Sequence, residues 1–211
     1  MAIYPITSWS CQDLRRMMIE VEGESLFVVR YSLFVVRCWA ISVNLACYMM
    51  SDHFLRMEEL PSLQLAAKGI TMTMAENRTV KLWQSAKPIM MRMQGRRPGF
   101  ISMEVFPEGI NFENFTPRTP FQKWAAVQLE EGAAVPEGLE SYSLQGGLYA
   151  VFRFRGLPAQ VAALMQHIFL EWIPASEYDT DDREHLAFMP EDYRPDDPDA
   201  EEEFFIPVRK R

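Results

Sequence analysis

The feature that most constrains the fold is an order of secondary structure that occurs twice between residues 65 and 208. Both copies read strand, helix, strand, strand, because one segment of each has apolar residues at helical spacing and the others alternate as strands do. The first copy comprises residues 65–74, 77–88, 99–109 and 121–129. The second copy comprises residues 146–154, 158–174, 185–192 and 202–208. Two such units are expected to bury their helices against sheets and to leave a cleft at the seam between them.

The helix of the second copy has the clearer pattern. Its apolar residues recur at i, i+3, i+4, i+7, i+8 and i+11: Val161, Leu164, Met165, Ile168, Phe169 and Trp172. This spacing predicts one broad apolar stripe that faces the core, and Pro174 ends it. In the first copy, Asn77 and Thr79 are the expected cap residues, and Pro88 is expected to interrupt the helix.

Composition excludes several function classes. The net charge of −8 argues against direct nucleic-acid binding, which requires a basic surface. Three cysteines, all before residue 50, do not form a disulfide framework and indicate a reducing, cytoplasmic location. The three scattered histidines add no metal-binding spacing, so neither a metal nor a cofactor is expected.

Residues 1–52 differ from the rest, and we interpret them as an N-terminal extension to a domain at 53–211. They contain the six-residue sequence SLFVVR twice, at 25–30 and 32–37. Arg37 interrupts any membrane span of the roughly 20 residues required, and two seven-residue units are too few for a coiled coil. A short duplication explains the repeat, with the natural start at Met49 or Met50. A segment that binds a partner or a membrane surface is the alternative.

Several spaced motifs resemble the GyrI-like, AraC-type effector-binding domains. In the second copy these are GGLYAVFRFRGLP, IFLEWIPASEYDTDDREHL and DPDAEEEFFIPV. In the first copy they are MAENRTVKLWQS, ISMEVFPEG and FENFTPRTPFQKWAAV. The resemblance covers about residues 54–209. It implies an α+β fold of two pseudo-symmetric βαββ halves, with antiparallel sheets, two main helices and a cleft that binds small hydrophobic or cationic molecules.

Members of this family stand alone or are fused to a DNA-binding domain, and this chain has no helix-turn-helix with a basic face. We therefore expect a stand-alone protein that sequesters or senses a small molecule, without a nucleic-acid or membrane partner. Two alternatives remain, because some members hydrolyse strained electrophiles and some inhibit gyrase. In the hydrolase alternative, Glu171 would act as general base and Tyr149 as proton donor.

Glu171 is the charged residue most strongly predicted to bind a ligand. At about 100° per residue it lies about 20° from Leu164, on the flank of the apolar stripe. It also lies in the last turn before Pro174, where the helix dipole disfavours an anion. The resemblance implies that the Glu of the EW motif faces the ligand cavity. The alternative is a solvated Glu at a helix end.

Aromatic residues complete the predicted site, because rings beside a carboxylate suit a lipophilic cation. The predicted ligand-binding residues other than Glu171 are Trp83, Trp124, Tyr149, Phe152, Trp172 and Phe188. Tyr149 and Phe152 alternate to opposite faces of one strand, so only one of them can line a given pocket. Many relatives read HFE where this chain has His185–Ala187. Glu104 is a possible substitute for that carboxylate, although an exposed strand Glu is the alternative.

Overall fold

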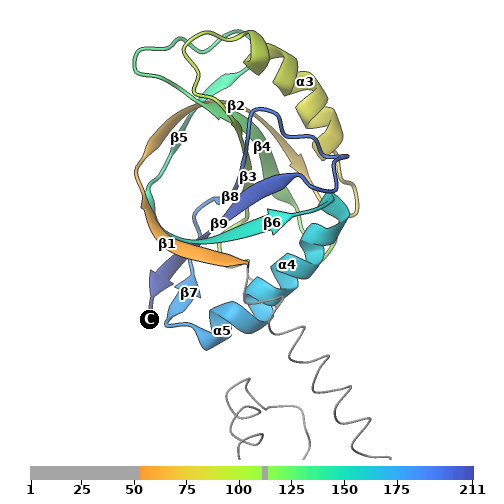
Figure 1. Ribbon diagram of the computed structural model, residues 1–211, viewed down its shortest axis with the longest axis vertical. Helices are drawn as coiled ribbons and strands as arrows, with labels where there is room; N and C mark the ends of the chain where they lie inside the picture. Colours follow the sequence, from red (N-terminus) through yellow and green to blue (C-terminus); the bar gives the residue numbers. More distant parts are fainter. Residues whose placement is uncertain (1–52, 111–113) are drawn as a thin grey trace, which may run out of the picture. The chain divides into compact units, whose positions relative to one another are not determined.

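The computed structural model describes residues 53–110 and 114–211, which form one antiparallel sheet with its helices on one side (Figure 1). The predictions about residues 1–52 lie outside the described residues. The strands are β1 (Phe54–Leu60), β2 (Leu63–Met72), β3 (Phe100–Val105), β4 (Phe121–Gln128), β5 (Glu140–Leu144), β6 (Gly147–Arg155), β7 (Tyr178–Thr180), β8 (His185–Met189) and β9 (Glu201–Lys210). The helices are α3 (Thr79–Arg92), η2 (Pro158–Gln160), α4 (Val161–His167), the π-helical turn η3 (Ile168–Trp172) and α5 (Ile173–Ala175).

The strand order is β1-β6-β9-β8-β3-β4-β2-β5, with β7 paired to β9. The predicted α+β fold of two βαββ halves is confirmed: β2, α3, β3 and β4 form one half, and β6, the α4–α5 helix, β8 and β9 form the other. The halves meet at β3 and β8, where Ser102 lies opposite Ala187. Strand β1 adds to the second half and β5 adds to the first, so each edge strand extends one half outward.

The two faces of the sheet bury different clusters. On the helix-bearing face, α3 packs through Leu82, Ala86 and Met90, and α4 and η3 pack through Leu164 and Ile168. The opposite face, here called the inner face, has its own apolar cluster drawn from both halves. Its largest members are Leu65, Met103, Leu144, Tyr149, Leu186 and Phe205. In Figure 1 the strands curve into a ring, and both helices lie outside it.

The helix predictions were right in place and partly wrong in detail. The predicted cap residues flank the actual one: α3 is capped by Arg78 without a side-chain cap hydrogen bond, and Thr79 is its first residue. The side-chain oxygen of Asn77 accepts a hydrogen bond from the backbone N–H of Thr79. The helix α3, however, continues through Pro88 to Arg92. Pro88 is exposed, so the carbonyl that loses its bond to the proline nitrogen faces solvent, and the helix tolerates the residue there.

Three strands were not predicted: β1, β5 and β7. Strand β5 lies partly in a stretch, residues 130–141, that the sequence indicated as turns. Both β1 and β5 are edge strands, and several of their side chains are polar and exposed, which weakens the alternation that marks a strand. Within the described part of the chain, no helix is long and apolar enough to cross a membrane.

Candidate ligand-binding site

Three of the seven predicted ligand-binding residues lie together on the inner face: Trp124, Tyr149 and Phe188. Trp124 and Phe188 are half-buried, whereas Tyr149 is fully buried. They come from β4, β6 and β8, so both halves contribute to this face. Phe152 lies on the other face of β6, as the alternation predicted.

The hydroxyl of Tyr149 is the notable group of this face. It is buried without a hydrogen-bond partner, and among the described residues it is the one buried side-chain polar atom in that state. An unsatisfied buried hydroxyl costs about 1–3 kcal/mol. Burial raises the pKa of Tyr149 to about 12, although the Arg183 guanidinium opposes the shift. The phenol is therefore neutral at physiological pH and free to donate or accept one hydrogen bond.

Polar and aromatic groups surround this hydroxyl. The guanidinium of Arg183 lies over the Tyr149 ring, 4.6 Å from its centroid. Glu184 accepts a hydrogen bond of 2.7 Å from the Tyr142 hydroxyl, and burial together with this bond raises the pKa of Tyr142. Glu58 lies directly opposite Tyr149 on the neighbouring strand β1. Of these two carboxylates, that of Glu58 is ion-paired with Arg56, and that of Glu184 acts on the buried phenol through its charge.

The aromatic rings of the inner face form two groups of rings in contact. Trp124 contacts Tyr142 edge-on, with centroids 4.9 Å apart. Phe188 contacts Phe205 at 4.7 Å, and Phe205 contacts Tyr149 at 6.1 Å. Trp124 can lie flat against the sheet because the neighbouring residue is Gly69: a Cβ there would come within 2.6 Å of the indole.

A hollow of about 500 Å³ opens beside Phe188, and Arg153 and Glu203 also line it. Its size falls within the range of roughly 300–1,000 Å³ that is usual for ligand pockets. Phe188 lines the hollow and also contacts Phe205, so the hollow adjoins the rings of the inner face at this residue. This face is therefore our candidate ligand-binding site.

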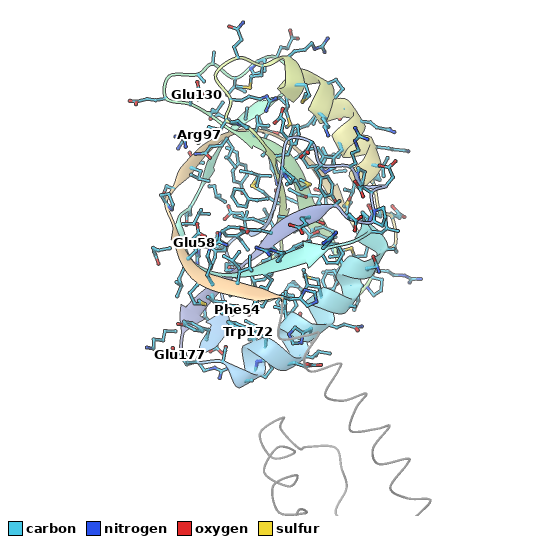
Figure 2. The ribbon with its side chains drawn as sticks, viewed as in Figure 1. Phe54, Glu58, Arg97, Glu130, Trp172 and Glu177 are labelled. Carbon is cyan, nitrogen blue, oxygen red and sulfur yellow. The ribbon has the colours of Figure 1, made fainter. Side chains whose placement is uncertain are left out.

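Three other predicted residues pack under the helices. Phe152 is fully buried and contacts Trp172 edge-on at 5.2 Å. Trp172 also stacks on Phe54 at 5.0 Å, and Figure 2 shows these two side chains next to each other where β1 begins. Trp83 lies on α3 and contacts Phe100 edge-on at 5.9 Å. These contacts give all three a packing role, and their binding role stays a prediction.

Glu171 lies on the π-helical turn η3 with an exposed side chain. Its side chain is 59% exposed, and Oε2 lies 3.0 Å from Nδ1 of His167. The π-helical turn at Ile168–Trp172 widens the helix, so a constant 100° per residue no longer gives the direction of residues after 168. The binding role of Glu171 stays a prediction. Two carboxylates on strands are desolvated, those of Glu104 and Glu202.

Glu104 forms an ion pair with Lys123, 2.7 Å from Oε1 to Nζ, and 27% of its side chain is exposed. It is thus neither unpaired nor a plain solvated strand residue. Burial raises the pKa of the Glu104 carboxyl, but the Lys123 ammonium outweighs burial and holds that pKa below its ordinary value. His185, opposite Glu104 on β8, has a pKa lowered by burial to about 4, so its imidazole is neutral.

Sequence reasoning missed Tyr142, Arg183 and Glu184. Tyr142 lies on an edge strand that was not predicted, and its bond to Glu184 joins residues 42 positions apart. Arg183 and Glu184 lie in an acidic run, which is typical of a solvated loop. The alternation in ESYSL at 140–144 was the available signal, since it directs Tyr142 and Leu144 to one face.

Comparison with known proteins identifies a family. The model of the GyrI-like small molecule binding domain matches residues 54–209. The structure of SAV2435 bound to tetraphenylphosphonium is similar at 15% identity with a TM-score of 0.56, over 73% of this chain and 93% of that one. The EcmrR C-terminal domain is similar at 11% identity with a TM-score of 0.56, over 74% and 97% of the two chains.

A hydrolase from Listeria innocua is also similar, at 10% identity with a TM-score of 0.51, over 73% of this chain and 91% of that one. At these identities the structural likeness concerns the fold alone. A comparison with curated protein sequences gives no match.

Proposed function

Because this chain belongs to the GyrI-like small-molecule-binding domain family, we propose that it binds a small hydrophobic or cationic molecule on its inner face, to sequester or sense it. The observation that carries the proposal is the Tyr149 hydroxyl, buried without a partner beneath a series of aromatic rings. A ligand with one polar group would satisfy this hydroxyl and recover the free energy that its burial costs.

The charges of the inner face favour a cation. Glu184 lies near Tyr149, whereas Glu58 is ion-paired with Arg56, and burial of a cation next to a carboxylate contributes more than the same contact in water. The half-buried rings of Trp124 and Tyr142 add cation–π attraction of about 0.5–2 kcal/mol each. SAV2435, which shares the fold, is a protein with a bound lipophilic cation, and this supports the same ligand class here.

Isothermal titration with tetraphenylphosphonium and with neutral triphenylphosphine oxide tests the proposal. We expect both to bind, because both are aromatic and about the size that a hollow of about 500 Å³ accepts. In Glu184→Gln the phosphonium should bind at least about tenfold more weakly, and the phosphine oxide should change by less than about twofold. Glu177→Gln is the matched control, since Glu177 is exposed and pairs with Lys210.

Two results would refute the proposal. The first is that neither probe binds. The second is that Glu184→Gln and Glu177→Gln weaken the phosphonium equally, which would place the cation away from the inner face.

The two residues predicted for the hydrolase alternative, Glu171 and Tyr149, belong to different parts of the structure. Tyr149 lies in the inner-face core, whereas Glu171 lies on a helix that packs against the opposite face, with its carboxylate exposed. This placement does not support joint catalysis by the pair, and the hydrolase alternative stays a prediction. Gyrase binding stays a prediction, and a supercoiling assay with purified gyrase tests it: unchanged supercoiling at saturating protein would exclude inhibition.

A further inference from the structure

We propose that two copies of this protein associate as a symmetric dimer through a surface formed by helix α3 and the neighbouring loop 190–200, here called the acidic loop. The acidic loop connects β8 to β9. Helix α3 contributes positive charge and exposed apolar side chains to this surface, and the acidic loop contributes negative charge. Because the two lie side by side on one molecule, each can contact the other on a second copy.

Helix α3 is basic, although the chain as a whole is acidic. It carries Lys81, Lys87 and Arg92 and no Asp or Glu, whereas the net charge of the chain is −8. Lys81 and Arg92 are exposed, and neither forms an ion pair within residues 53–110 and 114–211. Lys87 is less exposed, with its Nζ 4.7 Å from the centroid of the Phe100 ring. Two cations on the outer side of α3 are therefore open to the carboxylates of another molecule.

The same helix exposes apolar side chains. Val80 is 69% exposed and Met91 is 48% exposed. At about 100° per residue, positions eleven residues apart lie about 20° from each other, so these two side chains share one side of the helix. Pro88, between them in the chain, is also exposed. Exposed apolar side chains next to charged ones are typical of a surface that contacts another protein.

The acidic loop has the opposite charge. Its exposed carboxylates without a cationic partner in the described part of the chain are those of Asp192, Asp196 and Asp197. Its carboxylates with a partner are Glu191, which pairs with Arg96, and Asp199, which pairs with Arg155. Arg194 is the one basic residue in the loop sequence. The loop therefore presents a negative surface that complements the outer side of α3.

The acidic loop runs next to α3 (Figure 1). Tyr193 of the loop packs against the apolar cluster that contains the buried side of α3. Arg96 connects the two elements, because its guanidinium pairs with Glu191 and lies 3.6 Å from the sulfur of Met91. Met91 therefore lies between the basic helix and the acidic loop. A twofold axis near Met91 would place each helix against the acidic loop of the other copy.

A second copy suits this surface better than a nucleic acid or an anionic membrane. The net charge of −8 repels a polyanion at long range, so the few cations of α3 would bind one poorly. A second copy instead supplies carboxylates at the position that the symmetry requires. Each contact between the helix and the loop also occurs twice in such a dimer, once on either side of the axis.

Sedimentation velocity of the full chain at two salt concentrations tests the dimer. Raising the salt from about 0.1 M to about 1 M shortens the Debye length from about 10 Å to about 3 Å and weakens attraction between exposed charges. We expect a dimer at the lower salt concentration and a dissociation constant at least about tenfold larger at the higher one.

Two charge-reversal variants test the location. The helix variant carries Lys81→Glu and Arg92→Glu, and the loop variant carries Asp192→Lys and Asp196→Lys. Each variant alone should be monomeric, because like charges then face each other across the axis. An equimolar mixture of the two should form a heterodimer, because each altered helix then meets a loop of opposite charge.

Arg209→Glu with Lys210→Glu is the matched control. Both residues are exposed where β9 pairs with β7, and their reversal changes the net charge as much as the helix variant does. The control should dimerise as the unaltered protein does, and thermal melting verifies that all variants fold. A monomeric unaltered protein at low salt, association that neither reversal weakens, or a mixture that stays monomeric would overturn the proposal. Binding of the unaltered protein to anionic vesicles without self-association would also overturn it.

Discussion

The two faces of the sheet differ in whether a buried polar group has a partner. On the inner face, the Tyr149 hydroxyl has no partner in the ligand-free protein. On the helix-bearing face, the carboxylate of Glu104 already has the Lys123 ammonium. A ligand on the inner face can therefore gain by satisfying a protein group, whereas the Glu104 carboxylate on the helix-bearing face is already satisfied.

Because of this difference, changes to the two groups should affect the stability of the folded protein differently. Removing one partner of the Glu104–Lys123 pair should destabilise the folded protein, because the remaining charge is poorly hydrated and unpaired. Removing the Tyr149 hydroxyl should not damage the fold, because that hydroxyl contributes no hydrogen bond to it. The predictions below use this contrast.

The largest effect on stability is expected from Lys123→Met. Glu104 then loses its partner while 27% of its side chain remains exposed, and we expect the free energy of unfolding to fall by about 2–4 kcal/mol. Urea denaturation measures the loss. The double variant Glu104→Gln, Lys123→Met should recover at least about half of it, since no unpaired charge remains. A double variant as unstable as the single one would show that Lys123 stabilises by packing alone.

Acid should destabilise the protein through His185. Burial lowers its folded pKa from 6.5 to about 4, so below pH 6.5 the unfolded chain binds a proton that the folded protein excludes. Stability is therefore full above pH 6.5 and falls progressively down to about pH 4, by up to about 3 kcal/mol from this group. In His185→Gln this part of the pH dependence should disappear. If the free energy of unfolding falls equally with pH in both proteins, His185 is not the cause.

Tyr149→Phe should have a smaller effect on stability, and in the opposite direction. Removing an unsatisfied hydroxyl from the core should raise the free energy of unfolding by about 1 kcal/mol. Tyr178→Phe is the control, because Tyr178 is half-buried near α5, and it should change stability by less. A loss of stability in Tyr149→Phe would show that the hydroxyl has a partner in solution, such as an ordered water.

Glu171→Gln is expected to have the smallest effect. An exposed i,i+4 pair contributes about 0.3–0.5 kcal/mol at most, and the His167–Glu171 pair is of that kind. If the helical-wheel hypothesis were right, the same change would weaken binding of a cation by about 2–5 kcal/mol. Titration of tetraphenylphosphonium against this variant tests the two alternatives: an unchanged affinity indicates a solvated Glu171, and a large loss indicates the predicted binding role.

Much of the fold could be predicted from the sequence, because the apolar spacing of the two βαββ halves is local information. The opposite orientations of Tyr149 and Phe152 follow from strand geometry in the same way. The edge strands β1 and β5 were missed because polar side chains on an edge resemble a loop.

The site could be predicted only in part. The surroundings of Glu171 could not be predicted, because nothing in the residue pattern indicates the π-helical turn at Ile168–Trp172. The pair of Glu104 and Lys123, and that of Tyr142 and Glu184, depend on which strands lie side by side and in which register. Register is set by the assembled sheet, so residues 19 and 42 positions apart in the chain could not be paired from the sequence.

The most direct test of the central claim is the affinity of triphenylphosphine oxide for Tyr149→Phe. The claim is that the Tyr149 hydroxyl is buried for a ligand to hydrogen-bond, and the phosphoryl oxygen of this probe is a strong acceptor. We predict that the probe binds at least about tenfold more weakly to Tyr149→Phe than to the unaltered protein or Tyr178→Phe. Equal affinity for all three proteins would contradict the account, because the hydroxyl would then lie outside the binding site.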